Sequence, residues 1–530
     1  MAQLHIKLKF ATMKETSSLS LSVFVLLLTL INSVAAVAGT AGKNYPDSPN
    51  YPNATKWDEL SKSIGGRLVK CPALAWACSS GVAYAITAES AKDIQAGMKF
   101  AHEHNLRVSV VNTGHDFLGR NKGTGSLLIR TEKLKGVQWV PEWIPTVVNT
   151  TGTKMYVAPQ PAVIIQAGMM WQEVIPEVIK HNHIVVSGAE KTVGASGGWT
   201  MGGGHGAFSN KYGMGADNVL EFTVVTPSGE TVIANTNSHP DLFWALRGGG
   251  GGTYGIVTST VMKTYPKPSM YGINLDISAA ANSTRDQLLD ALAYYWAMTP
   301  NMTDWGLGGF PTVRYGSTYP GRLYAPGKTR SEIDAFWAPI AQKMIKLGAS
   351  VSTKTSEKEF DQWLEPISPV VNLPLPFVGN MLASRLLSRS KLNEANIPAI
   401  RTMLDKLLSY TNMVLPYAVG GGQVAANRDL DIGLNPAWRD ALMHLVVIGI
   451  DPKGAIEAME PLSVDSAAYW GEANVAEKGW KRTFFGPDAH YEKLLAVKRK
   501  YDPKNLLWCS PCVGMDMLEE RADGKLYTVV

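Results

Sequence analysis

The chain has 530 residues, of which 45% are hydrophobic and 18% are charged, and its net charge is +5. This composition is that of a folded protein long enough to form two hydrophobic cores. The small positive charge gives no indication of a nucleic-acid partner, so none is expected.

Residues 1–38 have the pattern of a secretory signal peptide. Three lysines precede an apolar run at 19–31, and small residues follow at 35–38. The apolar run is shorter than the ~20 residues that span a bilayer. Met13 is an alternative start. We therefore expect a secreted or secretory-lumen protein with no membrane association in its mature form.

The first β-α-β pattern follows in residues 82–111. Alternating residues predict a strand at 82–87, Ser90 and Asp93 predict a helix start, and β-branched residues predict a second strand at 107–111. A loop with four glycines, "VVNTGHDFLGRNKGTG" (110–125), begins where this strand ends. Ligands bind at the carboxyl ends of strands in open α/β sheets, so this loop is a candidate binding loop.

The remainder of the chain shows two patterns of predicted elements. Up to residue 270, short strands alternate with glycine-rich loops, and the predicted strands are 218–226, 230–234 and 255–264. From 271 to 485, strands at 272–277, 413–419 and 442–450 alternate with helices at 285–298, 331–346 and 392–410. This second pattern indicates an α+β domain with a largely antiparallel sheet. A helix at 490–501 ends the pattern.

The segment "GASGGWTMGGGHG" (194–206) allows three interpretations. It fits G-x-S-x-G, with Ser196 as a hydrolase nucleophile, but that motif needs a helix directly after the serine. A Rossmann fingerprint needs the same helix. Because glycine costs ~1 kcal/mol in a helix, we favour the third interpretation, a non-helical loop whose backbone approaches an anion or a flat ring.

A third loop, "RGGGGGTYGIV" (247–257), is by itself typical of a flexible hairpin. Together, however, the three loops could line one long groove. A single phosphate does not need so much exposed backbone, whereas a dinucleotide does.

Four stretches carry a resemblance to a known family: "NTGHDFLGR" (112–120), "TVGASGGWTMGGGHGAFSNKYGMGADNVLEFTVVTPSGE" (192–230), "HPDLFWALRGGGGGTYGIVTS" (239–259) and "LLAVKRKYDPKNLLW" (494–508). In these the chain resembles the FAD-linked oxidoreductases of the vanillyl-alcohol-oxidase superfamily with a PCMH-type FAD-binding domain. The match is to the berberine-bridge-enzyme-like branch and its fungal members.

The resemblance implies an α+β fold with a two-part PCMH-type FAD-binding domain (39–270). A substrate domain (271–485) with a largely antiparallel sheet covered by helices follows, and a C-terminal segment (486–530) returns to the first domain. It implies FAD bound covalently through His115. The expected cofactor-binding residues are Asn112, Thr113, Gly114, His115, Asp116, Gly119, Thr192, Val193, Gly194, Ser196, Gly197, Gly198, Gly203, His205, Gly206, Gly255, Ile256 and Val257. Of these, His205 is expected to be structural.

Two departures from the family pattern matter. Relatives with a second flavin bond carry a Cys just before T-V-G, but this chain reads "SGAEKTVG" and has no Cys between 79 and 508. We therefore expect one covalent bond. Relatives also often show Y-x-N-E, where this chain has Tyr469-Trp-Gly471-Glu472. Tyr469 and Glu472 are the catalytic candidates, and Tyr469 as a base would need a nearby cation, such as Arg439 or Lys481, to lower its pKa.

The expected activity is that of an oxidase. Hydride passes from an alcohol or amine carbon of a small molecule, such as a secondary-metabolite intermediate, to FAD, and O2 reoxidises the flavin. The alternatives are a carbohydrate oxidase and a non-redox cyclase in which FAD only shapes the pocket. A serine hydrolase ranks last.

The secretory context bears on the cysteines and sequons. Cys71 and Cys78 could close a local loop, and Cys509 and Cys512 form a C-x-x-C pair that could be redox-active, metal-binding or structural. We favour disulfides or free thiols over metal and expect no metal site. N-glycans are expected at Asn53, Asn149, Asn282 and Asn301.

Overall fold

The computed structural model describes residues 41–71, 81–147, 155–312, 319–358, 380–411 and 413–529. The expected signal peptide, Cys78 and Asn149 lie outside these residues. None of the described helices is long and apolar enough to cross a membrane.

The first sheet carries the candidate binding loop. Its four strands run in the order β1-β2-β4-β3, and β4 lies between the two strands of the predicted β-α-β unit, parallel to both. Ser90 starts the helix, and its backbone N–H donates to the Asp93 carboxylate at 3.0 Å, as the capping pattern predicts. The elements are α2 (Ala54–Ser63), β1 (Leu68–Lys70), β2 (Tyr84–Thr87), α3 (Ala91–Glu103), β3 (Val108–Val111) and β4 (Leu127–Arg130).

A six-stranded antiparallel sheet completes the first half of the chain. Its order is β5-β6-β10-β8-β9, and β7 also pairs with β10. The strands are β5 (Val137–Trp143), β6 (Gln160–Gln166), β7 (His183–Val185), β8 (Val219–Val225), β9 (Thr231–Asn235) and β10 (Ile256–Pro266). The helices are short: α4 (Trp171–Ile179), α5 (Gly198–Met201), α6 (Ser209–Tyr212) and α7 (Pro240–Leu246).

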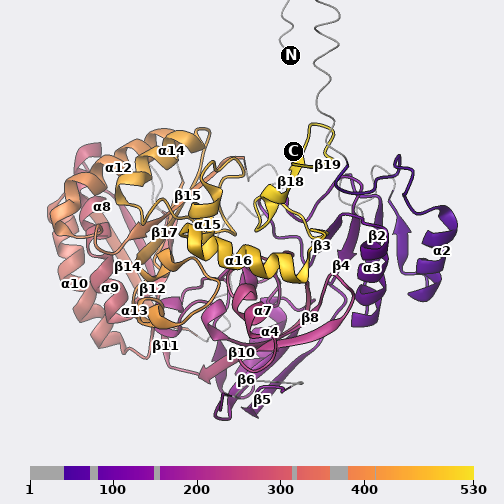
Figure 1. Cartoon of the computed structure of the whole chain (residues 1–530). Coiled ribbons are helices and arrows are strands. Elements are labelled where there is room, and N and C mark those ends of the chain that lie inside the picture. The colour runs from indigo at the N-terminus through magenta and orange to yellow at the C-terminus, as the bar shows by residue number, and fades with distance from the viewer. Residues whose placement is uncertain are drawn as a thin grey trace, which may run out of the picture.

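The second half is built on antiparallel sheets covered on one side by long helices (Figure 1). One sheet has the order β12-β13-β11-β14, with β11 (Met270–Ala279), β12 (Gly308–Thr312), β13 (Tyr319–Pro326) and β14 (Ala349–Glu357). The other, which we call the substrate sheet, has the order β15-β17-β16, with β15 (Leu382–Ser388), β16 (Val414–Tyr417) and β17 (Ala441–Ile448). A bridge between Gly309 and Ala418 joins the two sheets.

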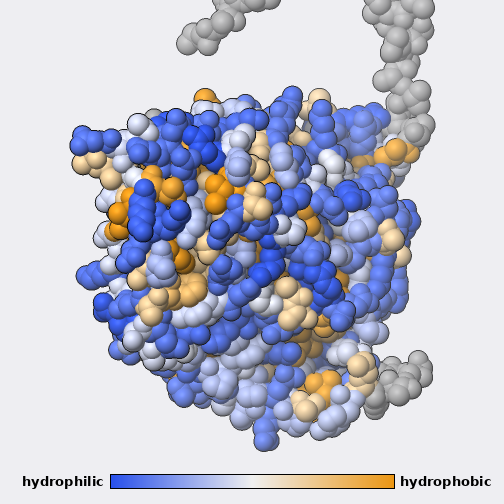
Figure 2. Space-filling model, turned by 90° about the vertical axis from the view of Figure 1, so that its left-hand side faces the viewer, coloured by the Kyte–Doolittle hydropathy of each residue, from blue (hydrophilic) through white to orange (hydrophobic). Residues whose placement is uncertain are grey.

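The helices of the second half are buried to different extents. They are α8 (Arg285–Ala297), α9 (Thr299–Trp305), α10 (Arg330–Lys346), α12 (Ile397–Tyr410), α13 (Gly422–Ala426) and α14 (Pro452–Met459). The helix predicted from residue 392 begins five residues later, at Ile397, because residues 394–396 form a 3-10 turn. The outer face of these helices is largely hydrophilic, with apolar side chains in small separate groups (Figure 2).

The C-terminal segment returns to the first half of the chain (Figure 1). It contains α16 (Asp488–Tyr501), β18 (Leu518–Glu520) and β19 (Leu526–Thr528), and α15 (Trp480–Phe485) directly precedes it. The Val108 N–H of β3 donates to the Leu506 carbonyl at 2.9 Å, and Arg107 pairs with Glu520 at 2.7 Å. Residues 508–509 of this segment, and residues 469–472 before it, lie beside the loop that follows β3.

Candidate active site

A cavity of about 310 Å³ lies between the glycine-rich loops of the first half and the substrate sheet of the second. One wall is formed by the ends of β3 and β10 and by the three loops predicted from the sequence. The opposite wall is formed by side chains of β15, β16 and β17, together with residues 469–472. We refer to these as the cofactor wall and the substrate wall.

Hydrogen bonds fix the first loop of the cofactor wall to the end of β6 and to the second loop. The Asn112 side chain donates to the Ala167 carbonyl at 2.6 Å, and the Gly194 N–H donates to the Thr113 hydroxyl at 3.2 Å. A Cβ on Gly194 would lie only 2.3 Å from the Asn112 amide nitrogen. Glycine at 194 is therefore required for the two loops to approach each other.

Our expectation that no helix follows Ser196 is wrong. The backbone turns into a one-turn helix, α5, between Gly198 and Met201. A single turn needs few helical residues, so the summed cost of the glycines that follow does not prevent it. Ser196 nevertheless has no hydrolase geometry, because its buried hydroxyl lies 2.5 Å from the hydroxyl of Thr260 and not beside a histidine.

The residues of the cofactor wall fit a bound dinucleotide. A Cβ on Gly114 or Gly198 would meet no atom within 4 Å, and both residues line the cavity. Among the described residues, the side-chain oxygens of Asn112 and Asn121 are buried without a hydrogen-bond partner, and both residues line the cavity. Bare backbone beside unsatisfied polar atoms is a surface that a polar ligand would complete.

Most predicted cofactor-binding residues line the cavity, but four do not: Gly119, Thr192, Gly203 and Gly206. Gly119 and Gly203 have positive φ angles of 75° and 115°, which suit turns. A Cβ on Gly206 would lie 2.0 Å from the Ser187 carbonyl oxygen, so this glycine permits a backbone contact. Thr192 lies behind His115 and hydrogen-bonds to it at 2.8 Å.

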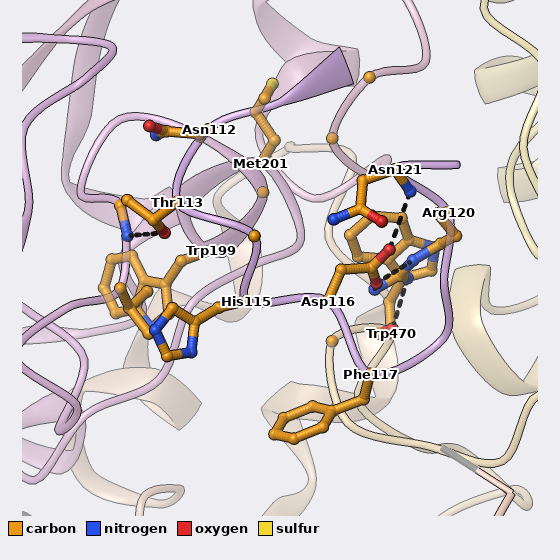
Figure 3. Close-up of a pocket in the computed structure, with 18 of the residues that line it drawn as sticks. Asn112, Thr113, His115, Asp116, Phe117, Arg120, Asn121, Trp199, Met201 and Trp470 are labelled. Atoms are coloured by element: carbon orange, nitrogen blue, oxygen red, sulfur yellow. Dashed lines mark hydrogen bonds and ion pairs between the residues drawn. The ribbon is translucent and has the colours of Figure 1, made fainter. Parts of the chain in front are cut away.

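Arg120 connects the candidate loop to the C-terminal part of the chain, and sequence reasoning missed it. Its guanidinium pairs with Asp116 at 2.7 Å, donates to the Trp470 carbonyl at 2.8 Å and lies 3.4 Å from the centre of the Trp470 ring. Figure 3 shows this group on one side of the cavity and His115 with Trp199 on the other. In the sequence, Arg120 is distinguished only by its position directly after the motif "GHDFLG".

The substrate wall is mainly apolar. Leu382, Leu415 and Val446 are buried and pack against Phe117, which the candidate loop projects toward them. Ile448 and the aromatic rings of Phe310 and Tyr417 extend this wall. Such a surface favours an apolar or aromatic molecule over a polyhydroxylated one, because it offers few partners for hydroxyl groups.

His205 and Glu472 are polar residues of the cavity lining, and the fully buried His444 lies directly behind them. The facing nitrogens of His205 and His444 are 3.1 Å apart, and the Glu472 carboxylate lies 3.9 Å from His444. Burial lowers the pKa of His205 to about 3 and holds that of His444 well below its usual range, so both rings are neutral. Burial also raises the pKa of Glu472 to about 7. A carboxyl group with this pKa can exchange a proton near neutral pH.

These three side chains are the one group in the described residues whose donor atoms could converge on a metal ion, since those atoms lie within 4.8 Å of one another. The facing imidazole nitrogens, however, already satisfy each other by a hydrogen bond. We therefore assign no metal to them.

Tyr469 does not have the surroundings that a tyrosine base requires. Burial, and then the charge of Glu472, raise its pKa well above 10, and Arg120 and the Gly204 backbone offset this only in part. The cations suggested from the sequence are engaged elsewhere: Arg439 pairs with Asp217 and Lys481 with Asp516. The Tyr469 ring instead packs edge-on against His205, with 4.9 Å between ring centres.

The C-x-x-C pair forms a disulfide between Cys509 and Cys512, and Cys509 lines the cavity. Cys71 is also disulfide-bonded. Its pairing with Cys78 stays a prediction, because Cys78 lies outside the described residues.

Comparison with known proteins agrees with this geometry. A family model described as an FAD binding domain matches residues 82–235, and one described as berberine and berberine-like matches 468–513. An uncharacterized FAD-linked oxidoreductase of Arthroderma benhamiae is 32% identical over 480 residues, covering 83% of this chain and 78% of the relative. The chain therefore belongs to the fungal, berberine-bridge-like branch of the VAO-type FAD-linked oxidoreductases, and it is an enzyme of that family.

Two solved structures share the fold. The VAO-type flavoprotein MtVAO713 from Myceliophthora thermophila C1 has a TM-score of 0.81 at 24% identity, covering 92% of this chain and all of the other. Glucooligosaccharide oxidase from Acremonium strictum, described with a 6-S-cysteinyl, 8α-N1-histidyl FAD, has a TM-score of 0.65 at 17% identity, covering 86% and 98%. The predicted α+β architecture is thus confirmed.

Proposed function

We propose that the protein is an FAD-dependent oxidase that acts on an alcohol or amine carbon of a small, largely apolar molecule. The observation that carries this proposal is the cavity itself. One wall exposes glycine-rich backbone and unpaired polar atoms suited to a dinucleotide, and the other is an apolar surface with one carboxyl group of pKa about 7. A secondary-metabolite intermediate is a molecule of this kind.

Each wall has its own task in this proposal. Bound FAD would supply the acceptor for a hydride from the substrate carbon, with O2 as the final electron acceptor. His115 would hold the cofactor by a covalent bond, and the loops of residues 112–121 and 194–198 would bind its pyrophosphate. Glu472 takes the proton from the substrate hydroxyl or amine. Leu382, Leu415 and Val446 exclude water from the reacting carbon.

The protein is further proposed to act outside the cytosol. Secretion would suit its disulfides. Asn53, Asn282 and Asn301 are exposed and accessible to glycosylation. Asn53 caps α2 through its side-chain oxygen, which leaves its amide nitrogen for a glycan.

Anaerobic flavin reduction tests the proposed activity. The purified protein is mixed with apolar alcohols and amines, and separately with glucooligosaccharides, while the flavin absorbance is followed. We expect bleaching with members of the first group and release of hydrogen peroxide when air is admitted. Bleaching by sugars alone would favour a carbohydrate oxidase. Product formed without bleaching would favour a non-redox cyclase.

A further inference from the structure

His115 is the first member of a hydrogen-bonded chain of three side chains. Its Nε2 lies 2.8 Å from the hydroxyl oxygen of Thr192, and that hydroxyl donates to the Glu190 carboxylate at 3.0 Å. The Thr192 backbone N–H also donates to the same carboxylate, at 3.3 Å. Both His115 and Glu190 line the cavity, whereas Thr192 lies behind them.

The chemistry of this chain fixes the positions of its protons. An ionised carboxylate can only accept hydrogen bonds, so the one hydroxyl proton of Thr192 points to Glu190. The Thr192 oxygen then accepts a hydrogen bond from His115, which requires the proton of the neutral ring to be on Nε2. Nδ1 consequently carries the lone pair.

The charge balance at His115 favours the neutral ring. Burial lowers the pKa of His115, and the negative charge of Glu190 opposes that effect. The ring is thus neutral before it reacts, and a negative charge stands nearby to stabilise a positive ring if one forms.

We propose that Thr192 and Glu190 are positioning residues for the covalent attachment of FAD: they hold His115 as the tautomer whose Nδ1 is the nucleophile, and they accept its Nε2 proton. This inference rests on the covalent link at His115 proposed above. The Nδ1–carbon bond forms to the flavin 8-methyl group, while one methyl C–H bond and the His115 Nε2–H bond break. Two electrons pass through the flavin ring to O2, which with two protons becomes hydrogen peroxide.

Covalent incorporation of FAD can be measured without substrate turnover. Protein produced under flavin limitation is mixed with excess FAD in air and precipitated with acid at timed intervals, and the flavin in the pellet is quantified by fluorescence. Bound but non-covalent FAD is measured in parallel by gel filtration. We expect Glu190→Gln and Thr192→Val to bind FAD normally while its covalent incorporation slows by roughly 100-fold. Thr192→Ser, which keeps the hydroxyl, restores the rate.

Matched variants separate the possible results. Thr258→Val, a buried threonine-to-valine change outside the cavity, controls for the substitution itself and keeps the wild-type rate. His115→Ala abolishes pellet flavin if the proposed link is correct, and retained pellet flavin would refute that link. Loss of the link in His115→Ala, with wild-type rates in Thr192→Val and Glu190→Gln, would overturn only the positioning role. If Glu190→Gln does not fold, the rates of Thr192→Val and Thr192→Ser decide alone.

Discussion

The cofactor wall and the substrate wall of the cavity are built in opposite ways. The cofactor wall is rich in glycines that expose backbone, and it is supplied by three loops that each occupy a short stretch of sequence. The substrate wall is side chains, brought together from β15, β16, β17 and residues 469–472. A backbone surface requires positions that carry no side chain, so it depends on glycine at those positions. A side-chain surface depends on which residues are present.

This difference suggests that the two walls have different sensitivities. A change in the cofactor wall should act on FAD binding or on folding, whereas a change in the substrate wall should act on turnover and selectivity. Variants on each side can test that separation.

Glu472→Gln is expected to have the largest effect. Loss of the only carboxylate among the cavity residues of the substrate wall should slow flavin reduction by roughly 10²–10⁴-fold while FAD stays bound. Stopped-flow absorbance with a reducing substrate measures this rate, and Glu457→Gln on the exposed face of α14 is the control. A Glu472→Gln protein that reduces its flavin at the wild-type rate would remove Glu472 from the mechanism.

The same residue predicts a pH dependence. Burial raises the pKa of Glu472 to about 7, so its proton-accepting form is lost as the pH falls below that value. The rate of flavin reduction in the wild type should therefore rise with pH up to about 7 and then level off, by about tenfold per unit on the acid side. The residual rate in Glu472→Gln should lack this dependence.

Gly198→Ala and Gly206→Ala should separate FAD binding from folding within the cofactor wall. A Cβ at 198 enters open cavity space, whereas a Cβ at 206 meets the Ser187 carbonyl oxygen at 2.0 Å. We expect the first to weaken FAD binding by roughly 10- to 100-fold without unfolding the apoprotein. The second should lower the free energy of unfolding by about 3 kcal/mol.

Both effects can be measured in a His115→Ala background, where FAD would bind reversibly. Flavin fluorescence titration gives the affinity, and urea denaturation of the apoprotein gives the stability. Equal loss of stability in the two variants would show that Gly198 is also a packing residue, and the assignment of its side of the cavity to FAD would fail.

Leu415→Ala should change selectivity more than overall activity. The Leu415 side chain is buried in the substrate wall against Leu382 and Val446. Shortening it enlarges the apolar space, so preference should move toward a bulkier apolar substrate by roughly tenfold in kcat/KM. Leu430→Ala, at a more exposed position, is the control. Unchanged selectivity would mean that substrate does not reach this wall.

The sequence predicted the cofactor wall better than the substrate wall because of how each is built. The glycine-rich segments 112–125 and 194–206 indicate backbone that must remain free of side chains. The loops and a groove shared by them could therefore be predicted from the sequence. Thr192 was found by motif, but its contact with His115 depends on folding. For the same reason, the sequence did not identify His444. In the sequence it is a single polar residue in an apolar strand, and only folding brings this residue of β17 beside His205.

The unfavourable surroundings of Tyr469 as a base could not be predicted, for a physical reason of the same kind. Its pKa depends on cations contributed by distant segments, and those segments are engaged elsewhere: Asp217 holds Arg439, and Asp516 holds Lys481. A tyrosine in a motif indicates a phenol near the flavin. Only packing decides whether that phenol can lose its proton.

Ser196→Ala is expected to have the smallest effect, and it tests whether Ser196 is a hydrolytic nucleophile. Ser196 follows Gly194 in a G-x-S-x-G pattern and a one-turn helix does follow it, so sequence and local backbone alone leave the hydrolase interpretation open. Its hydroxyl, however, is buried against Thr260. Replacing it should therefore cost about 1 kcal/mol in the free energy of unfolding, as for one lost hydrogen bond, and should leave flavin reduction within a few-fold of wild type. Loss of an ester-cleaving activity in this variant, with its flavin chemistry intact, would show that this wall performs catalysis through a side chain, and the contrast between backbone and side-chain walls would no longer hold.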